Sequence, residues 1–304
     1  MPFITQNFLI PQEQKAFLWL MRSFGYSQRE AQKILDKGWL TQSGRAITKS
    51  ESICGEVDFL HFSPQRLFLK KLLLRDSFVI YDKPAELLTH PRGTQTELSV
   101  CDELKAEFGS SANPAHRLDA LTSGILLCSI DKSKEAKLKS LFENGKIKKT
   151  YQALIRGEMK EEILLDAPIL SPKKEDKFLD LQIRSKISEE GKEAQTLFRP
   201  LWSKNGVSLI EAIPLTGRTH QIRLHLSHLG MPILGDPLYG CEDNHTREFL
   251  HSHLSSQKRK EYFGMERLAL HASRLEFEFE GEEIIVESKS GFKAPNSSDI
   301  DLSN

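Results

Sequence analysis

The chain has 304 residues, and its 42 Lys and Arg side chains balance 42 Asp and Glu, so the formal net charge is zero. The length suits one large domain or two ordinary ones, and 39% hydrophobic with 28% charged residues is typical of a soluble globular protein. Collagen-like and extensively disordered chains are excluded, and no apolar run is long enough for a membrane-spanning helix. The N-terminus lacks the features of a secretory signal and the four cysteines are widely spaced, so we expect a cytoplasmic protein.

Charge is distributed unevenly along the chain. Residues 131–149 contain seven lysines and three acidic residues, whereas residues 276–304 contain two lysines and eight acidic residues. A polyanion responds to local fields rather than to net charge, so the basic segments are compatible with a nucleic-acid partner. The alternative is that each charged run is a solvated face.

The first 62 residues predict a compact α+β module. Ser27 and Glu30 form a capping-box pattern at the start of a helix that Gly38 ends. Short apolar runs on both sides of the turn at 42–45 predict a hairpin, and residues 55–59 predict a further strand.

This module resembles the S4 RNA-binding module. The family has a helix opening with Ser-Arg, a glycine-bounded turn and a strand that begins with glycine, and the counterparts here are residues 27–30, 38–44 and 55–57. The alternative is a small structural cap with a few surface cations. The resemblance implies RNA contacts from three basic side chains on and around the capped helix: Arg29, Lys33 and Arg45.

We place a second domain at residues 63–288. Residues 61–71 are typical of a linker, and a strand over 78–81 opens the domain. The polar residues 289–304 are expected to form a disordered tail.

The second domain contains three clusters of polar residues. In the first, the run His-Arg-Leu-Asp-Ala-Leu-Thr-Ser-Gly at 116–124 leads into an apolar strand predicted over 125–130. A loop that enters a buried strand is a rigid place for a carboxylate, which points to Asp119. An isolated loop aspartate is, however, more often a capping residue.

The second cluster, Gly-Arg-Thr-His-Gln-Ile-Arg at 217–223, opens an amphipathic helix with apolar residues at Ile222, Leu226 and Leu229. The segment also contains three histidines, His220, His225 and His228. Their spacing matches no usual zinc pattern and the helix has no acidic residue, so we expect no metal site. In the third cluster, Lys149 and Tyr151 alternate on a strand predicted over 148–157, so their side chains point to the same side.

Together these clusters resemble the RluA-type RNA pseudouridine synthases over about residues 75–280. The resemblance rests on His-Arg-Leu-Asp-x-x-Thr-Ser-Gly, on Gly-Arg-Thr-His-Gln-Ile-Arg followed by Gly-x-Pro-Ile-Leu-Gly-Asp-x-x-Tyr-Gly, and on the segments 149–151 and 267–272. The chain departs from the family at Glu86, where a glycine is usual, and we expect that loop to differ in shape. The implied enzyme flips a uridine out of RNA and isomerises it to pseudouridine. Ribosomal RNA is favoured by the S4-like module, and transfer RNA is the alternative.

By resemblance, Asp119 is the catalytic carboxylate, Arg218 its ion-pair partner and Tyr151 the aromatic residue that stacks on the target uracil. A guanidinium beside an aspartate lowers the carboxyl pKa, which suits an ionised catalyst. The isomerisation is redox-neutral and the sequence lacks nucleotide-binding glycine motifs, so we expect no cofactor. Three further residues are expected to contact RNA: His116, Arg117 and Lys149. Arg117 is also expected to fill the space left by the flipped base. Lysines of the 131–149 segment are expected to contact phosphates: Lys132, Lys134, Lys137, Lys139, Lys146 and Lys148.

Two other classes of protein remain as alternatives. A non-catalytic RNA-binding protein predicts that Asp119→Asn has little effect. A retaining glycosidase needs a second carboxylate, and the nearest acidic residue in a motif, Asp236, is typical of a turn. We expect an α+β fold, with a mixed, largely antiparallel sheet, flanking helices and a central cleft, plus the small N-terminal α+β module, and a monomer.

Overall fold

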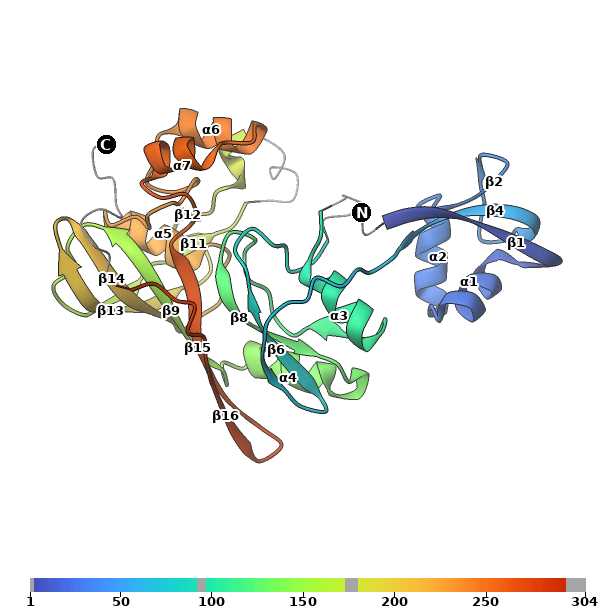
Figure 1. Cartoon of the computed structure of the whole chain (residues 1–304), viewed down its shortest axis with the longest axis horizontal. Coiled ribbons are helices and arrows are strands. Elements are labelled where there is room, and N and C mark those ends of the chain that lie inside the picture. The colour runs from blue at the N-terminus through green and yellow to red at the C-terminus, as the bar shows by residue number, and fades with distance from the viewer. Residues whose placement is uncertain (1–2, 92–96, 173–179, 294–304) are drawn as a thin grey trace.

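The computed structural model describes residues 3–91, 97–172 and 180–293. Figure 1 shows a small N-terminal module joined by one extended segment to a larger body. We call residues 3–62 the N-terminal module and residues 71–293 the main domain. None of the helices within the described ranges is long and apolar enough to cross a membrane.

The N-terminal module packs two helices against a four-stranded antiparallel sheet. Ser27 starts the second helix as predicted, because its hydroxyl accepts from the amide of Glu30, whose carboxylate accepts from the amide of Ser27. Trp19, Leu20 and Phe59 are buried between helices and sheet. The elements are α1 (Ala16–Phe24) and α2 (Gln28–Asp36), with strands in the order β1 (Phe3–Lys15), β4 (Ser52–Phe62), β2 (Leu40–Gln42) and β3 (Arg45–Ala46).

Strand β1 is absent from the sequence prediction. It pairs with β4 from Phe3↔Phe62 to Lys15↔Ser52, and the register shifts between Ile10 and Gln14. The interval contains Pro11, and a proline is tolerated in a strand at such a bulge. Most β1 side chains are exposed, so the strand lacks the apolar alternation by which strands are recognised.

The main domain is built on a ten-stranded sheet that is antiparallel except where β15 pairs with β8. This agrees with the expected mixed, largely antiparallel sheet. Its path runs through β10 (Ile163–Asp166), β13 (Gln195–Lys204), β14 (Val207–Pro214), β9 (Lys148–Arg156), β15 (Leu270–Phe279), β8 (Ser123–Ser129), β6 (Phe78–Lys83) and β5 (Lys71–Leu74), with β16 (Glu282–Glu287) beside β15 and β7 (Asn113–Pro114) beside β8.

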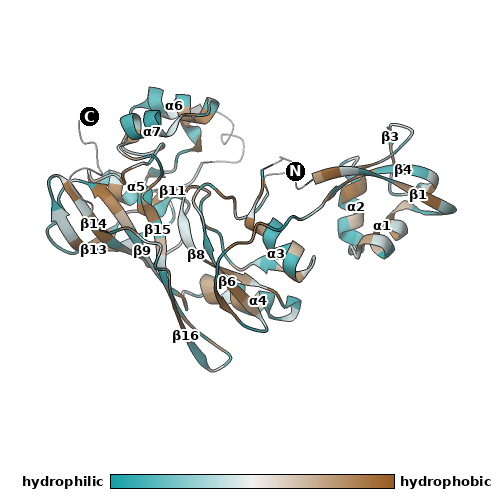
Figure 2. Ribbon diagram, viewed as in Figure 1, coloured by the Kyte–Doolittle hydropathy of each residue, from teal (hydrophilic) through white to brown (hydrophobic). Residues whose placement is uncertain are grey.

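Helices surround this sheet, and a two-stranded ribbon lies apart from it. The helices are α3 (Val100–Phe108), α4 (Lys132–Glu143), α5 (Gln221–His228), α6 (Asp243–His251), α7 (Ser256–Phe263) and the 3-10 helix η2 (Asp180–Ile183); the ribbon is β11 (Ile169–Leu170) with β12 (Lys186–Ile187). Figure 2 shows apolar residues concentrated on the central strands and polar residues on α6 and α7.

The sheet carries two hydrophobic cores. One gathers β6, β8 and α3 around residues such as Ile80, Leu104 and Leu126, and the other gathers β9, β14 and α5 around Ile155 and Ile210. The first core includes Leu118, beside Asp119, and the second core includes Ile222 of α5. The active-site candidates therefore come from two halves, each with its own core, that share strand β15.

The chain continues to pack beyond residue 288, where a disordered tail was expected to begin. Ser290 donates a hydrogen bond to Asp82, and Phe292 lies against the second core with the Arg267 guanidinium 4.7 Å from its ring centre. Residues 289–293 are thus held on the main domain, and residues 294–304 lie outside the described part of the chain.

The two halves meet closely where β8 runs parallel to β15. Gly124 pairs with Ala272 there and has a φ of +109°. A Cβ at residue 124 would lie 2.3 Å from the carbonyl oxygen of Ala272. Only glycine therefore fits this junction.

We predict that Gly124→Ala lowers the free energy of unfolding by more than about 3 kcal/mol, because the clash is with backbone of the neighbouring strand. Gly145→Ala is the matched control: its φ is +65° but its Cβ would meet no atom within 4 Å. We expect that control to cost about 1 kcal/mol. Urea unfolding measures both, and equal losses would contradict the close-approach explanation.

Candidate active site

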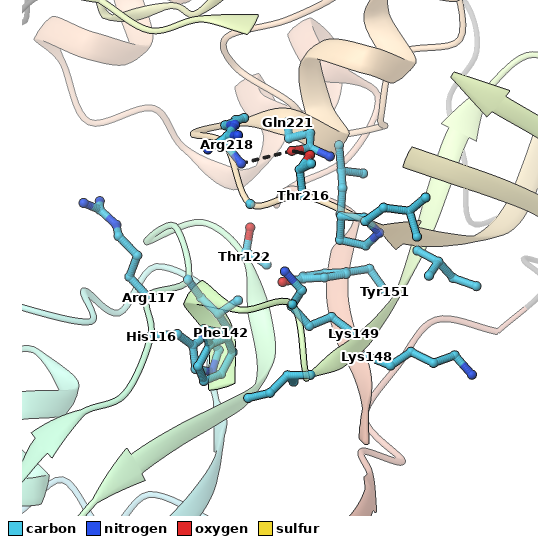
Figure 3. Close-up of a pocket in the computed structure, with 18 of the residues that line it drawn as sticks. His116, Arg117, Thr122, Phe142, Lys148, Lys149, Tyr151, Thr216, Arg218 and Gln221 are labelled. Atoms are coloured by element: carbon cyan, nitrogen blue, oxygen red, sulfur yellow. Dashed lines mark hydrogen bonds between the residues drawn. The ribbon is translucent and has the colours of Figure 1, made fainter. Parts of the chain in front are cut away.

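A cavity of about 840 Å³ opens between the two halves of the main domain, and the three polar clusters of the sequence meet in it. Its walls are the 115–119 loop, the end of α4, strand β9 at Lys149 and Tyr151, and the segment 213–223 that leads into α5. Figure 3 shows their side chains converging from these separate elements. The expected central cleft is therefore present.

The Asp119 loop is fixed by buried hydrogen bonds. The Thr89 hydroxyl donates to the carbonyl of Leu118 and accepts from its amide, at 2.8 and 3.2 Å. The Lys83 ammonium is buried and donates to the carbonyl of Ala120 at 3.1 Å. The carboxylate of Asp119 remains 24% exposed, so it is rigid yet accessible to a ligand.

Arg223, rather than Arg218, is the arginine beside Asp119, which corrects the sequence expectation. Its Nη1 lies 3.6 Å from Asp119 Oδ2. Its Nε and Nη2 donate to the two oxygens of Asp236 at 2.7 Å each, and its side chain is only 2% exposed. Arg218 Nε instead donates to the carbonyl of Glu193 at 2.9 Å, at the edge of the cavity.

The burial of α5 explains why Arg223 needs anionic partners. All of the first six residues of α5, from Gln221 to Leu226, are buried. A helix that is buried around most of its circumference cannot carry an arginine without an internal anion, because an unpaired buried charge is very costly. Asp236 is that anion, and it also accepts from two turn amides, those of Leu238 and Tyr239.

These contacts bear on the glycosidase alternative. Asp236 is fully buried, and both of its oxygens are bonded to Arg223. It is therefore committed to structure, and it does not face Asp119 as a second catalytic carboxylate would. Within the described ranges, no three His, Cys, Asp or Glu side chains form a group that could hold a metal ion.

The surroundings of Asp119 favour its ionised form. Burial alone would raise its pKa, but the charges of His220, Arg223 and Arg117 lower the pKa overall. Burial also lowers the pKa of His220 to about 4, so this imidazole is neutral at pH 7. At that pH the nearby cations that hold the carboxylate ionised are arginines, and Arg223 is the closer contact.

Tyr151 lies in β9 opposite Ala212 on one side and Ala272 on the other, and its ring contacts both cores. Figure 3 shows the phenol extending into the cavity. Burial, followed by the charge of Asp119, raises its pKa, so the phenol is protonated at neutral pH. Lys149 also lines the cavity, as the strand alternation predicts, and burial lowers its pKa.

Arg117 lines the cavity and is exposed, and Figure 3 shows its side chain at one side of the site, pointing away from Tyr151. The neighbouring His116 has an internal role. Its Nε2 accepts from the amide of Leu127 at 3.1 Å, and its ring stacks on Phe142 at 4.3 Å. Burial lowers the pKa of His116 to about 3, so it is a neutral ring that supports the Arg117 loop.

Most lysines of the 131–149 segment form ion pairs in this structure. Glu135 pairs with Lys132 and Lys139. Glu280 pairs with Lys134 and Lys137, and Glu276 pairs with Lys148. Their positive charge is therefore partly neutralised. Lys146 lines the cavity.

The basic residues expected to bind RNA in the N-terminal module lie away from this cavity. Arg29 and Lys33 are exposed on α2, and Arg45 pairs with Glu51 at 2.8 Å. None of the three lines the cavity. Any RNA contact that they make is a second one, separate from the site around Asp119.

Glu86 occupies the position where the resemblance has glycine. Its φ is +67°, in the left-handed region that favours glycine. The side chain forms an ion pair with Arg259 of α7. This ion pair links the loop to α7, and the expected difference in loop shape stays a prediction.

Comparisons with known proteins identify the family of this chain. A family model described as RNA pseudouridylate synthase matches residues 77–228. An uncharacterized RNA pseudouridine synthase of Helicobacter pylori is 42% identical over 284 residues, which are 92% of each chain. The tRNA pseudouridine synthase C of Vibrio cholerae is 34% identical over 68% of this chain and 84% of its own.

Solved structures give the same result for the fold. The human RNA Pseudouridylate Synthase Domain Containing 4 protein superposes with a TM-score of 0.55 at 27% identity, over 72% of this chain and 88% of its own. The family match begins at residue 77 and does not include the N-terminal module.

The chain belongs to the RluA family of RNA pseudouridine synthases, and it is an isomerase that acts on RNA.

Proposed function

We propose that Asp119 is the carboxylate that acts at C1′ of the target uridine. The reaction breaks the N1–C1′ bond, rotates the uracil and joins C5 to C1′. The carboxylate can attack C1′, stabilise an oxocarbenium-like C1′ or remove the 2′ proton, and each role requires it to be ionised. The observation that carries the proposal is the accessible Asp119 carboxylate held beside the buried guanidinium of Arg223.

Tyr151 is the surface on which the flipped uracil stacks. Flipping a base costs a few kcal/mol, and stacking on an aromatic ring returns about 1–3 kcal/mol. Because the raised pKa keeps the phenol protonated, Tyr151 suits stacking and hydrogen-bond donation, and a water molecule is the better acceptor for the C5 proton. Arg117 and Lys149 both line the cavity, and we assign Arg117 to fill the gap in the RNA and Lys149 to contact the RNA.

Ribosomal RNA is the substrate class that we propose. The supporting observation is the N-terminal module, whose exposed cations on α2 lie away from the cavity and offer structured RNA a second contact. We assign this module an S4-like RNA-binding role. Transfer RNA is the second candidate, because one relative is a tRNA pseudouridine synthase that is 34% identical to this chain.

We predict that Asp119→Asn abolishes isomerisation, with a loss of at least about a thousandfold in kcat, while RNA binding is retained. Tritium release from cellular RNA labelled at uracil C5 measures turnover, and separate ribosomal and transfer RNA fractions identify the substrate. Asp166→Asn is the control, since Asp166 is an exposed carboxylate on β10 outside the cavity. Full activity of Asp119→Asn would show that another carboxylate acts, and release only from transfer RNA would reject the ribosomal substrate.

Removal of the Arg223 charge is expected to shift the acid limb of the kcat profile to higher pH, because Asp119 loses one of the cations that, with His220 and Arg117, lower its pKa. The test uses Arg223→Gln combined with Asp236→Asn, so that no buried aspartate is left unpaired. Arg218→Gln is the matched comparison and is expected to leave the acid limb in place. A shift in Arg218→Gln alone would instead make Arg218 the partner of Asp119.

The N-terminal module is tested through the salt dependence of RNA binding. Replacement of Arg29, Lys33 and Arg45 by Gln is expected to weaken binding and to reduce the slope of log K against log[salt] by about 2–3. The control replaces three exposed lysines of the main domain that do not line the cavity: Lys160, Lys204 and Lys289. Equal slopes in the two triple variants would rule out a specific RNA contact by the module.

A further inference from the structure

Phe68 is an exposed aromatic ring in the segment that joins the N-terminal module to the main domain. The residue is 81% exposed, and among the large hydrophobic residues described as exposed it is the only aromatic one. Its φ is +53°, a conformation that bulky residues rarely adopt. Neither hydrophobic burial nor backbone preference explains a phenylalanine here.

A buried carboxylate holds the segment in this conformation. Glu103 of α3 is fully buried, and its Oε2 accepts from the backbone amides of Leu67 and Phe68, the latter at 2.9 Å. Its Oε1 accepts from the guanidinium of Arg66, with Nε at 3.2 Å and Nη2 at 3.1 Å. Three consecutive residues are thereby fixed, and the ring is held outward rather than left free to fold back.

The cations next to Phe68 in the sequence are more exposed than the carboxylates that they pair with. The Arg66 guanidinium lies 5.1 Å from the centre of the Phe68 ring, within cation–π range. Lys70 pairs with Asp82, and the lysine is 59% exposed whereas the aspartate is 8% exposed. Lys71 and Arg66 likewise lie outside their partner Glu107. Arg66 therefore places a cation beside the ring, and Lys70 and Lys71 add two more within three residues along the chain, each more exposed than the carboxylate that it pairs with.

We propose that Phe68 is a stacking platform for an unpaired nucleobase of the RNA substrate, outside the cavity that receives the target uridine. A nucleobase offers a flat face for the ring, and its phosphates suit Arg66, Lys70 and Lys71. An apolar protein partner would match a broader apolar patch than a single ring beside a guanidinium. Figure 1 shows the joining segment between the N-terminal module and α3, so a base held here lies between the two parts of the protein. The inference rests on the proposed RNA-isomerising function.

The test compares wild type, Phe68→Gly and Phe68→Tyr in tritium release from cellular RNA labelled at uracil C5. For Phe68→Gly we expect KM for RNA to rise about tenfold, the scale of one stacked base, with kcat changed less than twofold. Its melting temperature is expected to rise, because glycine adopts the positive φ freely and little buried surface is lost. Phe68→Tyr keeps the aromatic face and is expected to keep the wild-type KM.

Leu201→Ala, at another exposed apolar side chain, is the control and is expected to leave KM unchanged. An unchanged KM in Phe68→Gly overturns the proposal, as does a Phe68→Tyr variant as defective as Phe68→Gly. A fall in the melting temperature, or a change in sedimentation without RNA, also overturns it, since the ring would then pack on this protein or on a second copy. Filter binding of the same RNA to Asp119→Asn with and without Phe68→Gly separates this inference from the assigned chemistry: if wild type releases no tritium, the comparison of affinities still decides the role of Phe68.

Discussion

The site depends on the contacts of one buried group, the guanidinium of Arg223. It binds Asp236 through two hydrogen bonds of 2.7 Å and lies 3.6 Å from Asp119. One side chain therefore joins α5, the turn at Asp236 and the Asp119 loop. A buried ion pair costs desolvation free energy, and loss of one partner leaves an uncompensated charge, so these three segments must be in place together. The same arrangement that fixes the fold here also keeps the catalytic candidate ionised.

The sheet brings that contact together from distant parts of the chain. Strand β15 lies between β9 and β8, so Tyr151 and the Asp119 loop approach the cavity from opposite halves. The parallel contact at Gly124 and Ala272 sets the separation of those halves. Because the groups in a cavity between two packed cores are already ordered, binding a flipped base does not require free energy to order them.

Sequence patterns predicted much of this arrangement, for identifiable reasons. The capping box at Ser27, the alternation of Lys149 and Tyr151, and the mixed antiparallel sheet follow from local periodicity and from motifs of restricted spacing. The partner of Asp119 did not follow, because two arginines in one motif are equivalent until the helix has a direction and a buried face. Strand β1 was missed since its pairing with β4 is non-local and its side chains are mostly exposed. The packing of residues 289–293 was missed because it rests on a few contacts such as Ser290 with Asp82, which polar composition does not reveal.

The most direct test of the central claim is a ¹³C-carboxyl NMR titration of Asp119 in the free protein, assigned by comparison with Asp119→Asn. The account predicts a pKa below the ordinary 3.8, so that the resonance stays that of an ionised carboxylate down to that pH. It also predicts that the pKa rises in the variant that carries both Arg223→Gln and Asp236→Asn. A wild-type pKa at or above 3.8, or a value that does not respond to loss of Arg223, would contradict the assignment of Arg223 as the group that prepares Asp119.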